Sequence, residues 1–327
     1  MNLDLIFSIG PACRPAYHLK QHFLRFFSCP LDYQMDYSLD TVLHLFQTSF
    51  TDFFTEIEED TLQKGAHNNR RIIDTKNSII SLHHFDSAIP LPDAQKQFQT
   101  MMRKRFDLLH HAILHSDTVG LLCNRTDSIQ TLSAFLKSFA ILYPEQNFIL
   151  LNIRHNDFLS SIQKQEYRIT DKLTILDYEC YDLHPHDETY ESEFWIGNST
   201  VWDNILNEYR ITNHPFINQI QQWNKEDKKI LLYGAGEYCK KILCFLKKYQ
   251  IAPYGIAVSD TAGNPDTLHG IAVKPITSYF NLKHHSVIII TVINPDISAD
   301  IKQHLIELGF DSIATTNACL KLFYCQT

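Results

Sequence analysis

Cys13 stands at the point where the sequence predicts that a helix begins. The apolar run Leu5 to Ile9 is typical of a buried strand, and Gly10-Pro11 ends it. Pro15 fits only the first turn of a helix, where its missing N–H would have no partner anyway. A helix N-terminus carries partial positive charge, and Arg14 adds a full charge. We therefore expect a lowered thiol pKa and a nucleophilic thiolate at Cys13.

Such a thiol needs a base, and His83 and His84 are the best candidates by context. They lie in a segment of strand character, where adjacent side chains would point to opposite faces. One ring could then face Cys13 and take its proton while the sulfur attacks an acyl carbon. A cysteine early in the chain and a histidine later on a strand is the order of papain-like thiol enzymes. A buried structural cysteine and an unrelated histidine would explain the same residues.

A third group is expected to orient the histidine, and the sequence does not select one. Asn124 ends a predicted buried strand, a usual place for a site residue in an α/β sheet. Asp32 and Asp86 are further candidates, as is Asp127. Asp32 would equally suit a turn and Asp127 a helix cap.

Composition excludes several classes of protein. The chain has 327 residues, which favours two domains, and a net charge of −8 without a long Lys/Arg run, so nucleic acid is not expected as a partner. Its eight cysteines include no Cys-x-x-Cys pair, and its 17 histidines are scattered, so no metal is expected. No window approaches the roughly 20 apolar residues of a membrane span. These features indicate a cytoplasmic protein with reduced thiols.

The order of predicted elements indicates an α/β fold in two parts. Residues 118–123 and 148–153 read as buried strands joined by a helix, which is typical of a parallel crossover. The polar stretch 212–228 is interpreted as a linker between domains at 1–211 and 229–327. Alternating strands and helices in the last part predict a small, doubly wound parallel sheet.

The second candidate site is Gly234-Ala235-Gly236, between a predicted strand and a helix. Gly234 permits a tight turn, and Gly236 permits close approach of a phosphate to the helix N-terminus. Asp260 ends the next strand and could accept hydrogen bonds from ribose hydroxyls. Two residues argue against nucleotide binding. Cys239 occupies the position of the third glycine, and the charge of Glu237 would face a pyrophosphate. A module that packs or binds a partner without holding a nucleotide is the alternative.

The segment from Ser8 to Ala16 resembles the Ser-Leu-Gly-x-x-Cys-x-x-Ala opening of a bacterial family described as papain-like cysteine peptidases, a domain of unknown function. Its Pro-Phe-Asp-Trp element stands here as Pro30-Leu31-Asp32-Tyr33, and its His-Asp-Phe element as His83-His84-Phe85. The resemblance covers roughly residues 1–211 and implies Cys13 as nucleophile and His83 as base, with His84 replacing the usual acid. Further similarity lies in Arg103 to Arg105, Asn124-Arg125 and Trp195-Ile196-Gly197-Asn198.

Residues 229–315 resemble the small Rossmann-like module appended to bacterial glycosyltransferases and sugar-modifying enzymes. The matching segments are Ile230 to Gly236, Val258-Ser259-Asp260, Leu268 to Val273 and Ile288 to Val292. This resemblance implies a nucleotide or nucleotide-sugar as ligand and partners in glycan assembly.

Together these features predict a cysteine peptidase or acyl hydrolase/transferase that acts on an acyl or amide group. A papain-like α+β/α/β domain would carry the chemistry, and a Rossmann-like domain would link it to surface-polysaccharide metabolism. The alternative is a non-catalytic protein of polysaccharide assembly that binds a nucleotide or nucleotide-sugar, with Cys13 merely buried.

Overall fold

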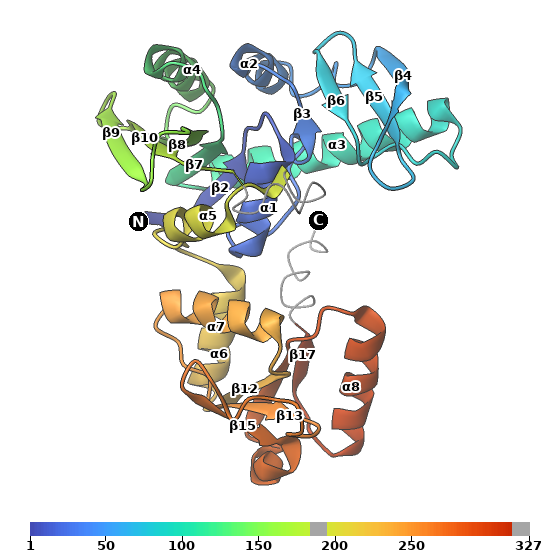
Figure 1. Cartoon of the computed structure of the whole chain (residues 1–327), viewed down its shortest axis with the longest axis vertical. Coiled ribbons are helices and arrows are strands. Elements are labelled where there is room, and N and C mark those ends of the chain that lie inside the picture. Colours follow the sequence, from blue (N-terminus) through green and yellow to red (C-terminus); the bar gives the residue numbers. More distant parts are fainter. Residues whose placement is uncertain (184–194, 316–327) are drawn as a thin grey trace. The chain divides into compact units, whose positions relative to one another are not determined.

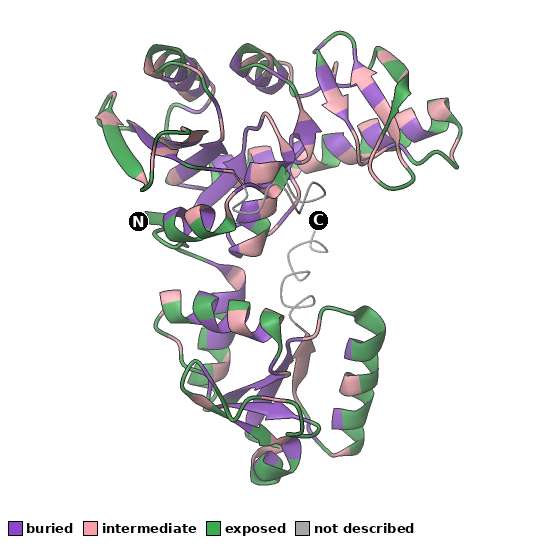
Figure 2. Cartoon of the chain, viewed as in Figure 1, coloured by how far each residue is buried: buried purple, intermediate pink, exposed green. Residues whose placement is uncertain are grey.

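A computed structural model of the chain describes residues 1–183 and 195–315 (Figure 1). The chain divides into two compact units, Met1–Ile211 and Thr212–Thr327. Both units are mixed α/β structures built on parallel sheets. Figure 2 shows that buried residues follow the strands of these sheets, whereas the outward faces of the helices are exposed.

Unit 1 is organised by a five-stranded sheet in the order β2-β7-β8-β10-β9. The strands β2, β7, β8 and β10 run parallel, and β9 is antiparallel at the edge. Their bounds are Leu5–Ser8 (β2), Thr118–Cys123 (β7), Asn147–His155 (β8), Gln163–Arg168 (β9) and Leu173–Cys180 (β10). The predicted crossover between residues 118 and 153 is present, with helix α4 (Ile129–Leu142) between β7 and β8.

Helices cover both faces of this sheet, because alternate strand residues point to opposite sides. One core includes Phe7 and Leu121 together with residues of α2 (Leu39–Gln47), α3 (Leu91–Leu114) and α4. The other includes Ile6 and Leu122 together with residues of α1 (Cys13–Gln21) and α5 (Ser199–Leu206). Burial on both faces explains the continuous apolar runs of the parallel strands.

A smaller antiparallel sheet in unit 1 has the order β3-β6-β5-β4. Its strands are β3 (Gln34–Met35), β4 (Ile57–Lys64), β5 (Arg70–Asp74) and β6 (Ile79–Ser81). The register places Gln34 opposite Ser81. Because β6 ends at Ser81, the expectation that His83 and His84 lie on a strand is wrong, and they occupy the bend that follows. The short strands β1 (Asn2–Leu3) and β11 (Arg210–Ile211) pair in parallel elsewhere in the unit.

Unit 2 contains a six-stranded sheet in the order β14-β15-β13-β12-β16-β17, in which only β14 is antiparallel among the described strands. The bounds are Lys229–Tyr233 (β12), Gly255–Val258 (β13), Thr267–Leu268 (β14), Ile271–Pro275 (β15), Ser286–Ile290 (β16) and Ile313–Thr315 (β17). Helices α7 (Glu237–Lys248) and α8 (Pro295–Glu307) and the 3₁₀ helix Ile276–Leu282 connect strands. Chain order reverses at β12, which pairs with β13 on one side and β16 on the other.

Most of the stretch 212–228, interpreted from the sequence as a linker, is helix α6 (Pro215–Lys225). The helix buries Phe216, Ile217 and Ile220, three apolar residues that the polar composition of this stretch obscures. Among the described residues, no helix is long and apolar enough to span a membrane.

Candidate active site

Cys13 is the first residue of α1, a few residues beyond the carboxyl end of β2. Its N-cap, Ala12, has extended backbone and offers no side-chain cap. Gly10 leads into this turn with φ +71°, and a Cβ at Gly10 would lie 1.9 Å from the hydroxyl oxygen of Tyr37. Only glycine therefore lets the chain leave β2 along this path and place Cys13 at the sheet edge.

The structure brings Cys13 and His83 together. The Cys13 Sγ lies 3.7 Å from the His83 Nε2, although the two residues are 70 positions apart in the chain. For the thiol to donate to Nε2, the imidazole must carry its proton on Nδ1. The sequence proposed this pair, and its geometry permits proton transfer from sulfur to nitrogen.

Burial keeps both partners uncharged at rest. It raises the pKa of Cys13 to about 11, against a smaller lowering effect of the residue's own backbone N–H. Burial and, secondarily, His67 lower the pKa of His83. The resting pair is therefore a neutral thiol and a neutral imidazole.

The expectation of an activated thiolate at Cys13 is not met. The sequence suggested that the positive charge of Arg14 would stabilise a thiolate, but Arg14 instead forms an ion pair with another residue. Its guanidinium Nη1 lies 2.7 Å from the carboxylate of Asp182. Without that charge, desolvation of the buried sulfur outweighs the helix N-terminus.

His84, the second predicted base, contacts other residues than Cys13. Its Nδ1 lies 3.3 Å from the Gln34 Nε2 and 3.2 Å from the Ser81 Oγ, and its ring packs on Phe98. Burial, followed by the charge of Arg105, lowers the pKa of His84 to about 3. Among the described residues no hydrogen bond joins His84 to Cys13, and its contacts fix the bend that presents His83.

None of the four candidates for a third member contacts His83 in the described part of the chain. Asp32 pairs with Arg25 at 2.5 Å and accepts from the Cys29 N–H at 2.8 Å. Asp86 caps the exposed turn that follows it, and Asp127 lies 3.8 Å from Arg125. Asn124 lies closer to the site, because its backbone N–H donates to the Gly10 carbonyl at 3.3 Å. Its Oδ1 is buried and has no hydrogen-bond partner among residues 1–183 and 195–315. Asn124 therefore lies at the sheet edge from which the Cys13 loop departs.

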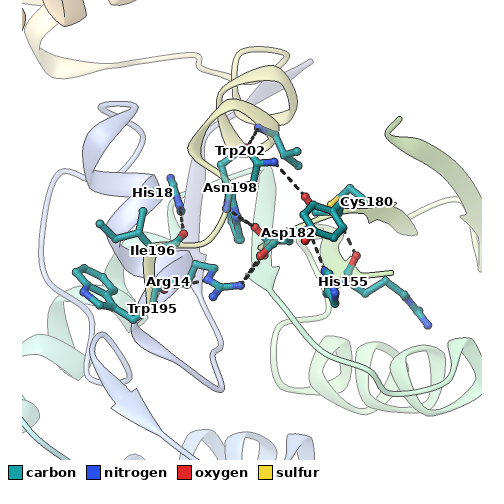
Figure 3. Close-up of polar contacts among 12 residues, drawn as sticks. Arg14, His18, His155, Cys180, Asp182, Trp195, Ile196, Asn198 and Trp202 are labelled. Atoms are coloured by element: carbon teal, nitrogen blue, oxygen red, sulfur yellow. Dashed lines mark hydrogen bonds and ion pairs between the residues drawn. The ribbon is translucent and has the colours of Figure 1, made fainter. Parts of the chain in front are cut away.

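A buried polar cluster ties α1 to the segment before α5 (Figure 3). Asp182 is 1% exposed and accepts from Arg14, from the Asn198 N–H at 3.0 Å and from the Trp202 Nε1 at 2.8 Å. Arg14 also donates to the Trp195 carbonyl at 2.9 Å. The residue beside Cys13 is thus anchored to two segments more than 160 positions away.

A pocket of about 540 Å³ lies next to this cluster. It is bounded by the loop before β9, the end of β10 and the start of α5, and the described residues that line it carry no charged side chain. Its lining residues are Leu159, Ser160, Ser161, Ile162, Cys180, Tyr181, Asn198, Thr200, Val201 and Asn204.

In unit 2 the predicted Gly234, Gly236 and Asp260 lie at the carboxyl ends of β12 and β13. Gly234 has φ +108°, and a Cβ there would lie 3.1 Å from the Thr291 Oγ1. Gly236 is the N-cap of α7 and has open space where a Cβ would be. The Asp260 carboxylate accepts from the Ala262 N–H at 3.0 Å, so its contact within the described chain is a local turn.

The described His, Cys, Asp and Glu residues form no group of three or more that could hold a metal ion. The site in unit 1 is thus a thiol that follows the carboxyl end of β2 and an imidazole that follows β6, with sulfur and nitrogen 3.7 Å apart. Residues 4–126 match the family described as "Putative papain-like cysteine peptidase (DUF1796)". The matched range contains Cys13, His83 and Asn124. No curated protein and no solved structure matches the chain significantly.

Sequence reasoning missed two residues beside the pair. Tyr33 packs its ring against His83, and Asp182 neutralises Arg14. For Tyr33 a signal existed in the Pro-Leu-Asp-Tyr segment that follows the first helix. No local pattern marks Asp182, because its partners are distant in sequence.

Proposed function

We propose that unit 1 is a thiol-dependent hydrolase or acyltransferase with Cys13 as nucleophile and His83 as general base. The observation that carries this proposal is the 3.7 Å separation between the Cys13 Sγ and the His83 Nε2. The match of residues 4–126 to the peptidase-like family supports it.

The neutral resting pair favours attack assisted by a base over a preformed thiolate. As the Cys13 sulfur bonds to the acyl carbon, His83 accepts the thiol proton on Nε2. The imidazolium then returns that proton to the departing amine or alcohol, which leaves a thioester on Cys13. Water or another nucleophile next gives a proton to His83, attacks the thioester and regenerates the thiol. The sequence offered Asn124 as a group to orient the histidine; we propose instead that it contacts the substrate oxygen at this sheet edge.

Acyl transfer to Cys13 is testable with p-nitrophenyl acetate, a small activated ester. A Cys244→Ala background removes an exposed thiol on α7 that would react on its own. We expect one acetyl group on Cys13 by peptide mass spectrometry, and acetylation about 100-fold slower in His83→Gln. His84→Gln should retain the rate if His84 serves only the bend. Absence of acetyl on Cys13, or an unchanged rate in His83→Gln, would contradict the proposal.

We also propose that unit 2 is a Rossmann-like module that holds a nucleotide or nucleotide-sugar and links the chain to glycan assembly in the cytoplasm. What favours a ligand there is the reversal of strand order at β12, together with the position of Gly236 as N-cap of α7, where a Cβ would meet no atom within 4 Å. A non-catalytic binding protein is the variant of this proposal in which Cys13 stays inert.

The Gly236→Asp variant separates binding from folding. Aspartate is a good N-cap, so α7 should persist, whereas its charge would repel a phosphate. We expect UDP or UDP-glucose to raise the melting temperature of the wild type but not that of Gly236→Asp. If neither compound nor ATP shifts the wild type, the nucleotide proposal fails.

A further inference from the structure

His83 has no acid or amide behind it in the described part of the chain. The Cys13 sulfur lies beside its Nε2, the ring of Tyr33 packs against it, and His67 lowers its pKa. The centroids of the two rings lie 5.7 Å apart with an interplanar angle of 64°, an edge-to-face arrangement. An imidazole poised for proton transfer must still be held in one orientation.

Tyr33 is itself held in an unusual conformation. Its φ is +61°, a region that an aromatic residue rarely adopts and keeps only when its surroundings enforce it. Just before it, the buried Asp32 carboxylate fixes the turn by accepting from the Cys29 N–H and from Arg25. The Arg25 guanidinium also lies over the Tyr33 ring, with its carbon 5.5 Å from the centroid.

The sheet register brings Tyr33 to His83. Gln34 pairs with Ser81 across β3 and β6, so Tyr33 stands one residue before a paired position and His83 two residues after its partner. The Gln34 side chain also contacts His84 next to His83. Three features therefore fix the orientation of the Tyr33 ring: the pairing of β3 with β6, the turn at Asp32, and Arg25.

We propose that Tyr33 is a positioning residue whose ring holds the His83 imidazole toward Cys13 and takes the place of a third polar member. This inference rests on the proposed function of unit 1. An aromatic ring offers no strong acceptor to the Nδ1 proton, so it orients the imidazole without raising its basicity. It also excludes water, in keeping with the burial that lowers the pKa of His83.

Ring and hydroxyl are separable by substitution. Tyr33→Phe keeps the ring and loses only the phenol hydroxyl, whereas Tyr33→Leu loses the aromatic contact with His83. We expect Cys13 acetylation by p-nitrophenyl acetate to stay within about twofold of wild type in Tyr33→Phe. In Tyr33→Leu it should fall roughly tenfold, the rate equivalent of one aromatic pair. Tyr167→Leu on β9, also partly buried, serves as the control for a generic loss of packing.

The pKa of His83 gives a readout that general loss of stability would not move. Water entering beside His83 in Tyr33→Leu should raise that pKa toward its ordinary value, measured by NMR titration and assigned with His83→Gln. Tyr33→Phe and Tyr167→Leu should leave it unchanged. The inference is overturned if Tyr33→Phe is as slow as Tyr33→Leu, or if Tyr33→Leu leaves the pKa of His83 unmoved. Because this titration needs no turnover, it decides the role of Tyr33 even if the wild-type protein fails to acetylate.

Discussion

The guanidinium of Arg14 forms a 2.7 Å ion pair with the carboxylate of Asp182, which lies at 1% exposure just beyond β10. This ion pair neutralises the positive charge nearest in sequence to Cys13 and holds the first turn of α1 in place. Burial raises the pKa of Asp182 even with Arg14 beside it, because the cost of removing the carboxylate from water exceeds the stabilisation that Arg14 provides.

Removing one partner of the Arg14–Asp182 pair should therefore lower the stability of the folded protein. Asp182→Asn retains an oxygen for the Trp202 Nε1 and the Asn198 N–H but removes the carboxylate charge that lies 2.7 Å from Arg14. We expect the free energy of unfolding in urea to fall by about 3–5 kcal/mol. In Asp171→Asn, which breaks the exposed pair with Arg168, the change should stay below about 1 kcal/mol. Equal losses of unfolding free energy in both variants would mean that the buried pair stabilises the fold no more than the exposed pair.

Alkylation by iodoacetamide should report the neutral thiol of Cys13. Since burial raises its pKa to about 11, the thiolate fraction, and with it the rate, should rise tenfold per pH unit from pH 7 to about pH 10. Peptide mass spectrometry should show slower labelling of Cys13 than of the exposed Cys244 at pH 7. A rate plateau for Cys13 below pH 7 would instead indicate a preformed thiolate.

The pairing of Cys13 with His83 was predictable, because a cysteine at a helix start and a histidine late in a β-rich segment are visible locally. The charge state of the pair was not. Desolvation at Cys13 depends on everything packed around it, and the partner of Arg14 lies 168 positions away.

Helices and strands were likewise predictable only where the signal lies within a single segment of the chain. Apolar runs located the parallel strands well, since burial on both faces leaves a strong signal in each strand. The helix at Pro215–Lys225 was missed because only three of its residues are buried in a polar stretch. The role of Tyr33 depends on a strand register that no single segment encodes.

Acid should destabilise the protein through His18. Burial is the main cause that lowers the pKa of this histidine to about 3, and its Nε2 donates to the Ile196 carbonyl at 2.8 Å. The unfolded chain takes up this proton near pH 6.5 and the folded chain only near pH 3, so stability is complete above pH 6.5 and is lost as pH falls. The loss attributable to His18 between pH 6.5 and pH 5 should be about 2 kcal/mol.

His18→Gln tests this dependence, because glutamine keeps an N–H donor but does not titrate in this range. Urea unfolding at the two pH values should show a smaller drop for His18→Gln than for wild type. His115→Gln, at an exposed helix end, should retain the wild-type drop. Equal slopes for His18→Gln and wild type would exclude His18 as the source.

Gly10 should tolerate no side chain. In Gly10→Ala the new Cβ would meet the Tyr37 hydroxyl at 1.9 Å, in addition to the strain of φ +71°. Gly263→Ala has a similar φ, +76°, but open space, so it isolates the backbone strain of about 1–2 kcal/mol. Thermal unfolding should therefore show a clearly larger loss in Gly10→Ala than in Gly263→Ala, together with slower acetylation of Cys13. Matching losses would show that the path out of β2 adjusts easily.

The pairing of β1 with β11 means that residues 2–3 and 210–211 of unit 1 lie side by side. A short peptide could therefore join these two positions without displacing either strand. Unit 1 should then accept new ends elsewhere, for instance in the exposed turn around Asp157 and Phe158. Such a circular permutant would still bring Cys13 to His83, because neither the β2–α1 connection nor the β3–β6 pairing would be cut.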